Sequence, residues 1–219
     1  MQDRVTKKQD VFPDNAVRLV ILETPMEIKI QEIKADRLSE YAKIPISFEV
    51  KSIFQVDLIN NGLDGIRLHE EKVVVSYVKN YDSYEDGGPE RWVTQFNIHN
   101  WVIFLATDNN KPIGGATVAF DTPGVNMLCG RKDLAVLWDI RVHPDFRHKG
   151  VGTMLFQKAV EWSKKKGCKH LKIETQNVNA PACKFYAKQG CKLGAIDRYG
   201  YAGHPKVGHE VMLIWYLDL

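Results

Sequence analysis

The sequence has 219 residues, enough for one domain with a sizeable hydrophobic core. A hydrophobic fraction of 44%, a charged fraction of 26% and a formal net charge of +3 are typical of a globular protein and give no bulk electrostatic reason to bind nucleic acid or a membrane surface. No apolar run approaches the roughly 18 residues of a membrane-spanning helix, and the four cysteines form neither a CxxC pair nor a metal-ligand spacing, so we expect a cytoplasmic protein with reduced thiols.

The first part of the chain predicts a polar leader followed by strands and one helix. Residues 1–16 are polar and lack the apolar core of a signal peptide, so we expect a flexible leader before a single domain over residues 17–219. Residues 47–59 fit either a strand or a distorted helix, with the strand favoured. Alternation and helical spacing predict the other elements of this part: strands at 17–23, 26–33 and 72–84, and a helix at 35–44.

The second part of the chain predicts alternating strands and helices. Residues 100–121 contain an apolar strand, an Asp-Asn-Asn-Lys-Pro turn and a second strand, which together indicate a hairpin. Residues 179–190 indicate a helix that begins at an asparagine cap, has proline in its first turn and ends at a glycine. The remaining predictions are strands at 133–142, 169–175, 191–197 and 209–219, and a helix at 152–166 whose Leu155, Ala159 and Trp162 share one face.

A loop with two glycines and three basic side chains, Arg147 to Gly152, joins the strand at 133–142 to the following helix. Glycine permits positive φ and lets main-chain N–H groups approach a ligand closely. The helix N-terminus adds unpaired donors and a partial positive charge. A pyrophosphate is therefore the natural occupant, and a glycine-rich turn with solvated cations is the alternative. The loop lacks the Gly-Lys-Ser/Thr ending of a Walker loop and the third glycine of a dinucleotide fingerprint.

The strand ending in DIRV, the R-x-x-G-x-G loop, the asparagine-led helix and the Phe185-Tyr186…Gly190-Cys191 segment resemble, in order and distance, the acetyl-CoA-binding region of the GNAT N-acetyltransferases. The resemblance covers about residues 100–219. It implies an α/β (α+β) GNAT fold, in which helices flank a mixed central sheet of about six to seven strands with a splay between strands four and five. Residues 174–197 and the ending EVMLIWYLDL also resemble the streptothricin acetyltransferases, which acetylate an amine of a lysine-like moiety in that antibiotic.

The resemblance implies that acetyl-CoA, the acyl donor, lies along the splayed strand and over the loop. The exposed strand edge would pair with the thioester arm through Ile140, Arg141 and Val142. Asn179 would contact the pantetheine region, and it also suits a plain helix cap. Arg147 would lie near the phosphates. The pyrophosphate would accept hydrogen bonds from the main-chain N–H groups of His148, Lys149, Gly150, Val151, Gly152 and Thr153.

The resemblance also implies catalytic roles. Tyr186 matches the family's general acid, which protonates the departing thiolate, although a tyrosine beside Phe185 also suits a core. An attacking alkylamine is mostly protonated at neutral pH, and a carboxylate acting through water can take that proton. Asp139 and Glu174 are the candidates, and either one can instead be structural. Many relatives carry an acid one position before Asp139, where this chain has Trp138.

The activity expected from the resemblance is direct transfer of an acetyl group to a primary amine of a small molecule. The more specific expectation is that this molecule is streptothricin and that the activity confers resistance to it. A protein or peptide N-acetyltransferase and a non-catalytic acyl-CoA sensor are the alternatives. No histidine pair at i, i+4 and no Cys/His set indicates a metal. A homodimer is among the assemblies that the resemblance allows. Acidic and aromatic side chains suited to a cationic acceptor are Glu49, Asp57, the 81–86 loop, Tyr199 and Tyr201.

Overall fold

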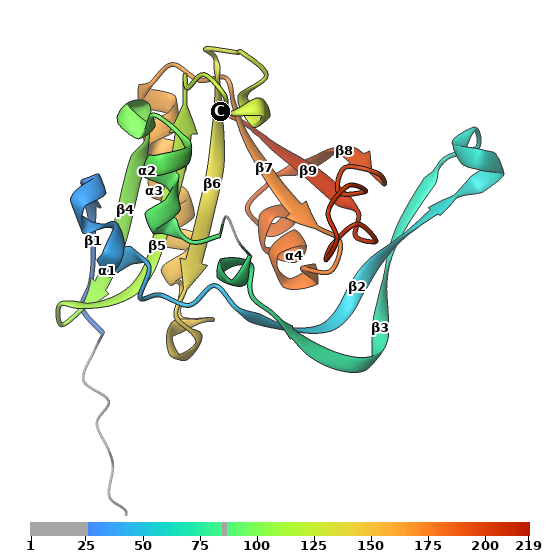
Figure 1. Cartoon of the computed structure of the whole chain (residues 1–219), viewed down its shortest axis with the longest axis horizontal. Coiled ribbons are helices and arrows are strands. Elements are labelled where there is room, and N and C mark those ends of the chain that lie inside the picture. Colours follow the sequence, from blue (N-terminus) through green and yellow to red (C-terminus); the bar gives the residue numbers. More distant parts are fainter. Residues whose placement is uncertain (1–25, 85–86) are drawn as a thin grey trace, which may run out of the picture.

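The computed structural model describes residues 26–84 and 87–219 (Figure 1). The leader expected at 1–16 and the strand expected at 17–23 lie outside the described residues, as do positions 85 and 86 of the acidic loop. In the described part of the chain, no helix is long and apolar enough to cross a membrane.

A mixed seven-stranded sheet forms the body of the protein and confirms the expected fold class. Its strands follow the order β1-β4-β5-β6-β7-β9-β8, and every neighbouring pair is antiparallel except β6 and β7. The strands are β1 (Ile28–Ile33), β4 (Val102–Asp108), β5 (Lys111–Phe120), β6 (Leu134–Val142), β7 (His170–Gln176), β8 (Lys192–Asp197) and β9 (Met212–Asp218).

The fourth and fifth strands of this sheet, β6 and β7, separate partway along their length. They pair only where Leu134–Leu137 lie beside His170–Ile173. Beyond Leu137, β6 pairs with β5 alone, up to Val142. Figure 1 shows the two strands diverging from their common end. The predicted splay is therefore present, and it leaves one edge of β6 without a strand partner.

Helices cover both faces of the sheet. On one face, α3 (Val151–Lys165) and α4 (Ala180–Lys188) pack over a core that contains Leu155, Phe156 and Ala159. On the other face lie α1 (Leu38–Tyr41) and α2 (Trp92–Gln95), above a second core rich in aromatic side chains. The helix predicted at 35–44 is shorter than expected, because a 3-10 turn precedes α1 and Pro45 follows closely.

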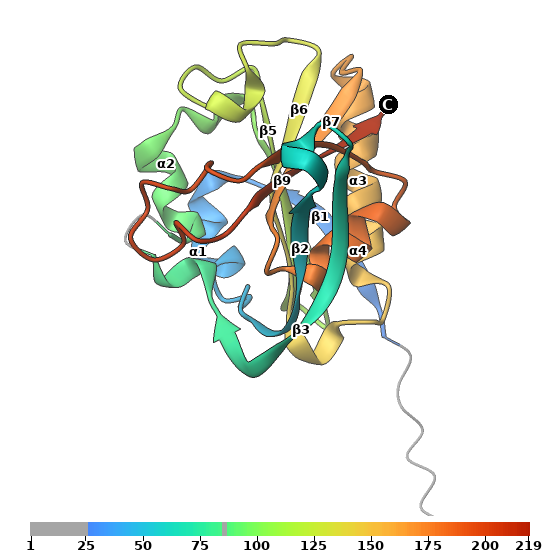
Figure 2. The same ribbon diagram turned by 90° about the vertical axis from the view of Figure 1, so that its right-hand side faces the viewer.

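A long two-stranded ribbon projects from the body (Figures 1 and 2). It consists of β2 (Phe48–Leu58) and β3 (Ile66–Lys79), which pair with each other and form a separate sheet. The 47–59 segment is thus a strand, as favoured. The strand expected at 72–84 begins earlier, at Ile66, and ends at Lys79, before a 3-10 turn at Tyr81–Ser83. Asn177 anchors the ribbon: its main-chain oxygen accepts from the Phe54 N–H at 2.9 Å and its Nδ2 donates to the Phe54 oxygen at 3.0 Å. We call residues 48–79 the arm.

Candidate active site

The glycine loop presents a row of free main-chain donors. Gly150 is the N-cap of α3 and has φ of 85°, in the left-handed region where glycine is favoured. The first helical bond runs from the Met154 N–H to the Gly150 oxygen. The N–H groups of residues 148–153 donate no hydrogen bond within the described chain, and the first turn of α3 contains no acidic residue. A side chain built at Gly150 would meet no atom within 4 Å, so the cradle is open to a ligand.

Arg147 is tied to main-chain carbonyls beside this loop. Its Nε donates to the Val142 oxygen at 3.1 Å, and its Nη2 donates to the Ser47 oxygen at 2.7 Å. Burial lowers the pKa of Arg147. The side chain therefore links the end of β6 to the residue that precedes the arm, which sequence reasoning did not anticipate.

Arg141, placed on the splayed strand, is the centre of a buried ionic network. Its side chain is 1% exposed and bonds Asp139 through Nε at 2.9 Å and Nη2 at 2.7 Å. It also bonds Asp82 at 2.8 and 3.1 Å and the Ile44 oxygen at 3.1 Å. Burial, the largest single influence, lowers the pKa of Arg141, but the Asp139 charge and the hydrogen bonds to Asp139 and Asp82 together outweigh it and raise that pKa. Because Asp139 also accepts the Tyr41 hydroxyl at 2.6 Å, its carboxylate has three donors.

Tyr186 lies in α4 with its side chain almost fully buried. Its ring packs against Phe156 and Phe185 at centroid distances of 6.2 and 5.4 Å. Burial, and then the nearby Asp139 charge, raises the pKa of Tyr186 well above its usual value. The raised pKa keeps the phenol protonated at neutral pH. No residue in 26–84 or 87–219 hydrogen-bonds its hydroxyl, so this O–H group is available to donate to a ligand.

Asn179 caps α4, because its Oδ1 accepts the Ala182 N–H at 3.2 Å. Its Nδ2 donates to the Tyr81 hydroxyl at 3.3 Å, from the short 3-10 turn that follows β3. Burial raises the pKa of Tyr81. The same turn carries Asp82, the partner of Arg141, so residues from β6 and α4 hold it on either side.

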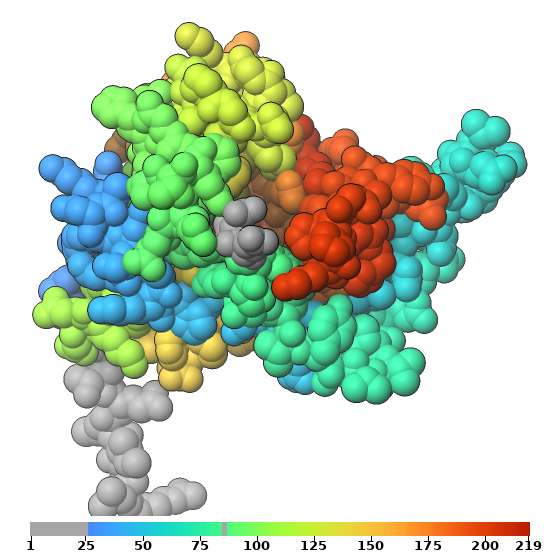
Figure 3. All heavy atoms as spheres, viewed as in Figure 1, coloured from blue at the N-terminus to red at the C-terminus, as the bar shows by residue number. Residues whose placement is uncertain are grey.

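Glu174 lies on β7, beyond the point where β7 leaves β6. Its Oε1 accepts the Tyr201 hydroxyl at 2.6 Å, and its side chain is only partly buried. Burial and the Glu174 charge raise the pKa of Tyr201. Tyr201 belongs to the segment between β8 and β9, and Figure 3 shows the surface hollowed where that orange-red part faces the yellow-green part of the chain. Glu174 therefore has one donor where Asp139 has three.

Some residues proposed for the acceptor site are elsewhere. Glu49 pairs with Lys51 and Asp57 pairs with Arg67, so both carboxylates are engaged by cations of the arm itself. Sequence reasoning missed a buried pair in which Lys79 donates to both carboxylate oxygens of Glu210. Burial lowers the pKa of Lys79, and the Glu210 charge opposes that shift. Because the two residues are 131 positions apart in the sequence, no local pattern indicates this contact.

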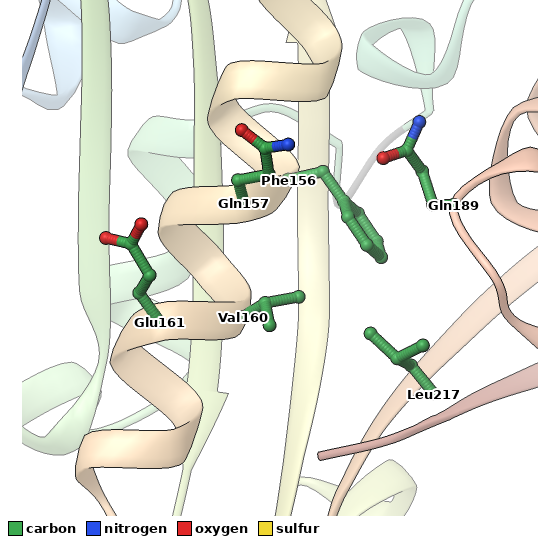
Figure 4. Close-up of a pocket in the computed structure, with 6 residues that line it drawn as sticks. All are labelled: Phe156, Gln157, Val160, Glu161, Gln189 and Leu217. Atoms are coloured by element: carbon green, nitrogen blue, oxygen red, sulfur yellow. The ribbon is translucent and has the colours of Figure 1, made fainter.

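A separate pocket of about 290 Å³ lies between α3 and β9 (Figure 4). Gln189 at its rim donates to the Thr153 hydroxyl at 3.4 Å, which connects this pocket to the glycine loop. Its lining is Phe156, Gln157, Val160, Glu161, Gln189 and Leu217. Over the described ranges, no group of three or more His, Cys, Asp or Glu side chains is placed to hold a metal ion.

Comparison with known sequences gives one family and relatives that include streptothricin acetyltransferases. Residues 71–191 match the model of the acetyltransferase (GNAT) family. The streptothricin acetyltransferase of Escherichia coli is 29% identical over 170 residues, which cover 77% of this chain and 84% of that protein. Streptothricin acetyltransferase A of Bacillus subtilis is 44% identical over 82 residues, which cover 37% of this chain and 47% of that protein, less than half its length.

A solved structure from Bacillus anthracis, provisionally described as a streptothricin acetyltransferase in complex with acetyl coenzyme A, has the same overall fold. It superposes with a TM-score of 0.68 at 29% sequence identity. The match covers 88% of this chain and 100% of that one, so the similarity includes the arm-bearing first half as well as the glycine loop.

Proposed function

This chain belongs to the GNAT acetyltransferase family, and we propose that it moves an acetyl group from acetyl-CoA to a primary amine of a small molecule, with streptothricin as that molecule. The observation that carries the reaction is the combination, in one chain, of an open β6 edge with free N–H donors at the start of α3. The proposal includes a cytoplasmic location and a role in resistance to the antibiotic.

The residues present fit acetyl-CoA. The unpaired N–H groups of residues 148–153 and the side chain of Lys149 suit a pyrophosphate, which needs donors and positive charge. The edge of β6 from Ile140 to Val142 suits an extended amide-containing chain, because it offers main-chain donors and acceptors that no strand uses. Asn179 has a second lone pair on the oxygen that caps α4, so capping and ligand contact are compatible.

Acetyl-CoA supplies an activated acetyl thioester; transfer of its acetyl group to a protonated amine forms the amide, releases the thiol of CoA and leaves one proton to be removed. We assign the proton donor to Tyr186, because its hydroxyl is protonated and unpaired beside the splay. We assign the proton acceptor to Glu174, which is partly exposed and accepts only from Tyr201. Asp139 is then a positioning residue, because its carboxylate is already bonded by the Tyr41 hydroxyl and by two nitrogens of Arg141.

Streptothricin as acceptor is supported by the similarity to the Escherichia coli enzyme, which extends over 77% of this chain rather than over the glycine loop alone. The antibiotic's amines are cationic, and Glu174 with Tyr201 places a carboxylate and an aromatic ring at the open side of β7. Asp82 lies across the splay and is held in place by Arg141. Both groups suit an ammonium that must lose a proton before it attacks.

The test measures thiol release from acetyl-CoA with streptothricin, free lysine, aminoglycosides, polyamines and short peptides. We expect turnover on streptothricin with kcat/KM above about 10⁴ M⁻¹s⁻¹, the lower end for real substrates. Turnover on peptides but not on streptothricin would favour the protein or peptide alternative. Acetyl-CoA binding without any turnover would favour the sensor.

The same assay tests the assignment of the base. Glu174→Gln should lower kcat about 100-fold or more, and Glu161→Gln on the exposed face of α3 is the matched control that should leave it unchanged. If Glu174→Gln retains full kcat while Asp139→Asn loses it in a folded protein, the base is Asp139.

A further inference from the structure

Lys172, on β7, is a buried cation without an acidic partner. The described residues include three buried basic residues, Lys79, Arg141 and Lys172. Lys79 is paired with Glu210, and Arg141 is paired with Asp139. Lys172 is only 8% exposed and forms no ion pair with any described carboxylate. Lysine is almost never so deeply buried unless it is paired, so the surroundings of this nitrogen call for an explanation.

The Lys172 ammonium is directed at the turn that precedes β6. Its Nζ donates to the Met127 oxygen at 3.0 Å and to the Cys129 sulfur at 3.5 Å. It also lies 5.9 Å from the centre of the Tyr216 ring, a weak cation–π contact. Among these three neighbours, the thiol is the group with redox chemistry. No other described cysteine has a lysine nitrogen as a hydrogen-bond partner.

Cys129 is accessible from solvent and is held in place by its turn. It is exposed, whereas the other three cysteines are buried. Its N–H donates to the Asn126 oxygen at 3.0 Å, and the preceding Leu128 is 2% exposed in the second core, so the turn is anchored. The sulfur is therefore open to a small oxidant and is kept against the Lys172 nitrogen. An exposed thiol beside a cation is the setting in which cysteines react.

We propose that Cys129 and Lys172 form a covalent sulfur–nitrogen cross-link when a peroxide oxidises the thiol. In the first step the Cys129 sulfur takes one oxygen atom from hydrogen peroxide, which breaks the O–O bond, oxidises the sulfur to a sulfenic acid and releases water. In the second step Lys172 gives one proton to solvent, and its lone pair attacks the sulfur. The S–N bond forms, the S–O bond breaks, and the hydroxide leaves as water with a second proton from the nitrogen. One thiol, one ammonium and one peroxide thus give one S–N link, two waters and one proton.

The geometry suits this reaction. The Sγ–Nζ separation of 3.5 Å lies within the about 3–3.5 Å of a near-attack arrangement, and the flexible lysine stem can close the remaining gap. The two residues are 43 positions apart, so the link closes a loop that contains β6 and α3. It lies where β6 and β7 are paired, because Lys172 is opposite Val136. It involves none of the residues assigned to acetyl transfer, so it stands or falls separately from the proposed activity.

The experiment treats the full chain with a small molar excess of hydrogen peroxide and follows it by intact mass and by tryptic digestion. We expect a loss of about 2 Da, the two hydrogens removed when the S–N bond forms. A disulfide would give the same mass, and the digest distinguishes the two. It should contain one product that joins Cys129 to Lys172, with no cleavage after Lys172. A second peroxide can insert one oxygen into the link and release water, so a linked product about 16 Da heavier supports the same contact.

Two variants separate this link from general oxidation. Lys172→Met keeps the aliphatic stem and removes the amine, so the thiol should stop at a sulfenic acid that dimedone traps. Lys132→Met removes an exposed lysine close to Cys129 and is the matched control, which should cross-link like the natural sequence. If Lys172→Met does not fold, the digest of the natural sequence decides alone, since it identifies both linked residues.

Three results would overturn the proposal. The first is a natural sequence whose Cys129 is oxidised, to a dimedone-reactive or a higher acid, while Lys172 stays unmodified. The second is a disulfide through Cys129 in place of the link to Lys172. The third is a folded Lys172→Met protein that still loses about 2 Da on the same treatment.

Discussion

Replacing Arg141 by methionine removes the guanidinium at the centre of the ionic network and keeps a side chain of similar length. The variant loses the bonds to Asp139, to Asp82 and to the Ile44 oxygen. The Asp139 side chain is 7% exposed and would keep only the Tyr41 hydroxyl as donor. Asp82 is 26% exposed and can recover solvation from water. The cost therefore comes mainly from an unpaired, buried Asp139 charge.

Breaking a buried ion pair by removing one partner costs about 3–5 kcal/mol of unfolding free energy. Domains have only about 5–15 kcal/mol in total, so Arg141→Met should be folded but severely weakened. For a protein of this size each kcal/mol lowers Tm by about 2–4 °C, which gives a decrease of about 6–20 °C. Arg37→Met is the control, because Arg37 and Glu40 form a pair whose side chains are each 37% exposed, so water screens the pair and its loss should change the stability far less.

The assay is urea unfolding of the natural sequence, Arg141→Met, Asp139→Asn and the double variant. If the buried charge is the cause, the double variant should be more stable than Arg141→Met alone, because the Asp139→Asn change leaves no charge to be unpaired at that position. The reasoning is refuted if Arg141→Met lies within about 1 kcal/mol of the natural sequence. It is refuted equally if adding Asp139→Asn lowers the stability of Arg141→Met further.

Two other substitutions and two measurements on the natural sequence have definite expected outcomes. Tyr186→Phe removes the free hydroxyl, so kcat should fall about 100-fold or more in the thiol-release assay while acetyl-CoA affinity by calorimetry is unchanged; equal kcat would contradict the acid assignment. Gly150→Asp strains the backbone, because Gly150 has φ of 85°, but its side chain meets no atom within 4 Å, so the variant should fold with reduced stability; it should lose CoA binding by calorimetry, since it puts a negative charge among the phosphate donors, and normal binding would refute the loop assignment. Burial raises the pKa of Cys183 and of Cys191 to about 11 from an ordinary 9.0, so iodoacetamide at about pH 8 should label exposed Cys129 first by mass spectrometry. In the unfolded chain the Cys183 and Cys191 thiols lose their protons at a lower pH than in the folded protein. Their contribution to stability is therefore complete below about pH 9, and the unfolding free energy measured in urea should decline between pH 9 and pH 11; a flat profile would contradict the pKa shift.

The second half of the fold was predictable because its signals are local. The helix from 179 to 190 contains its own cap, proline and stop, and the structure places α4 at Ala180–Lys188 with Asn179 as the cap. The hairpin around residues 109 and 110 has both turn residues at positive φ, as an Asn-Asn turn favours. The glycine loop was recognisable for the same reason, since Gly150 and the start of α3 are adjacent in the sequence.

The rest of the site depends on contacts between residues that are distant in sequence. Arg141 and Asp82 are 59 residues apart, and Lys79 and Glu210 are 131 apart. Periodicity reports which face of an element is buried, but it does not report which polar group on another element lies opposite. The sequence therefore indicated Arg141 as a position on the splayed strand and gave no sign that its side chain is the centre of a network. The length of the arm could not be predicted for the same reason. The first residues of β3 are rich in charged side chains and have no strand pattern of their own, and they form a strand because they pair with β2.

These long-range contacts explain how the sheet stays open between β6 and β7. Two parallel strands that separate lose ladder hydrogen bonds, and that loss must be offset elsewhere. On one side, Arg141 and Asp139 fasten β6 to α1 and to the turn after β3. On the other side, Asn177 fastens the end of β7 to the arm, and Glu174 is bonded by Tyr201. Each strand is thus held by contacts other than the missing ladder, and these contacts keep β6 and β7 apart beyond Leu137 and Ile173.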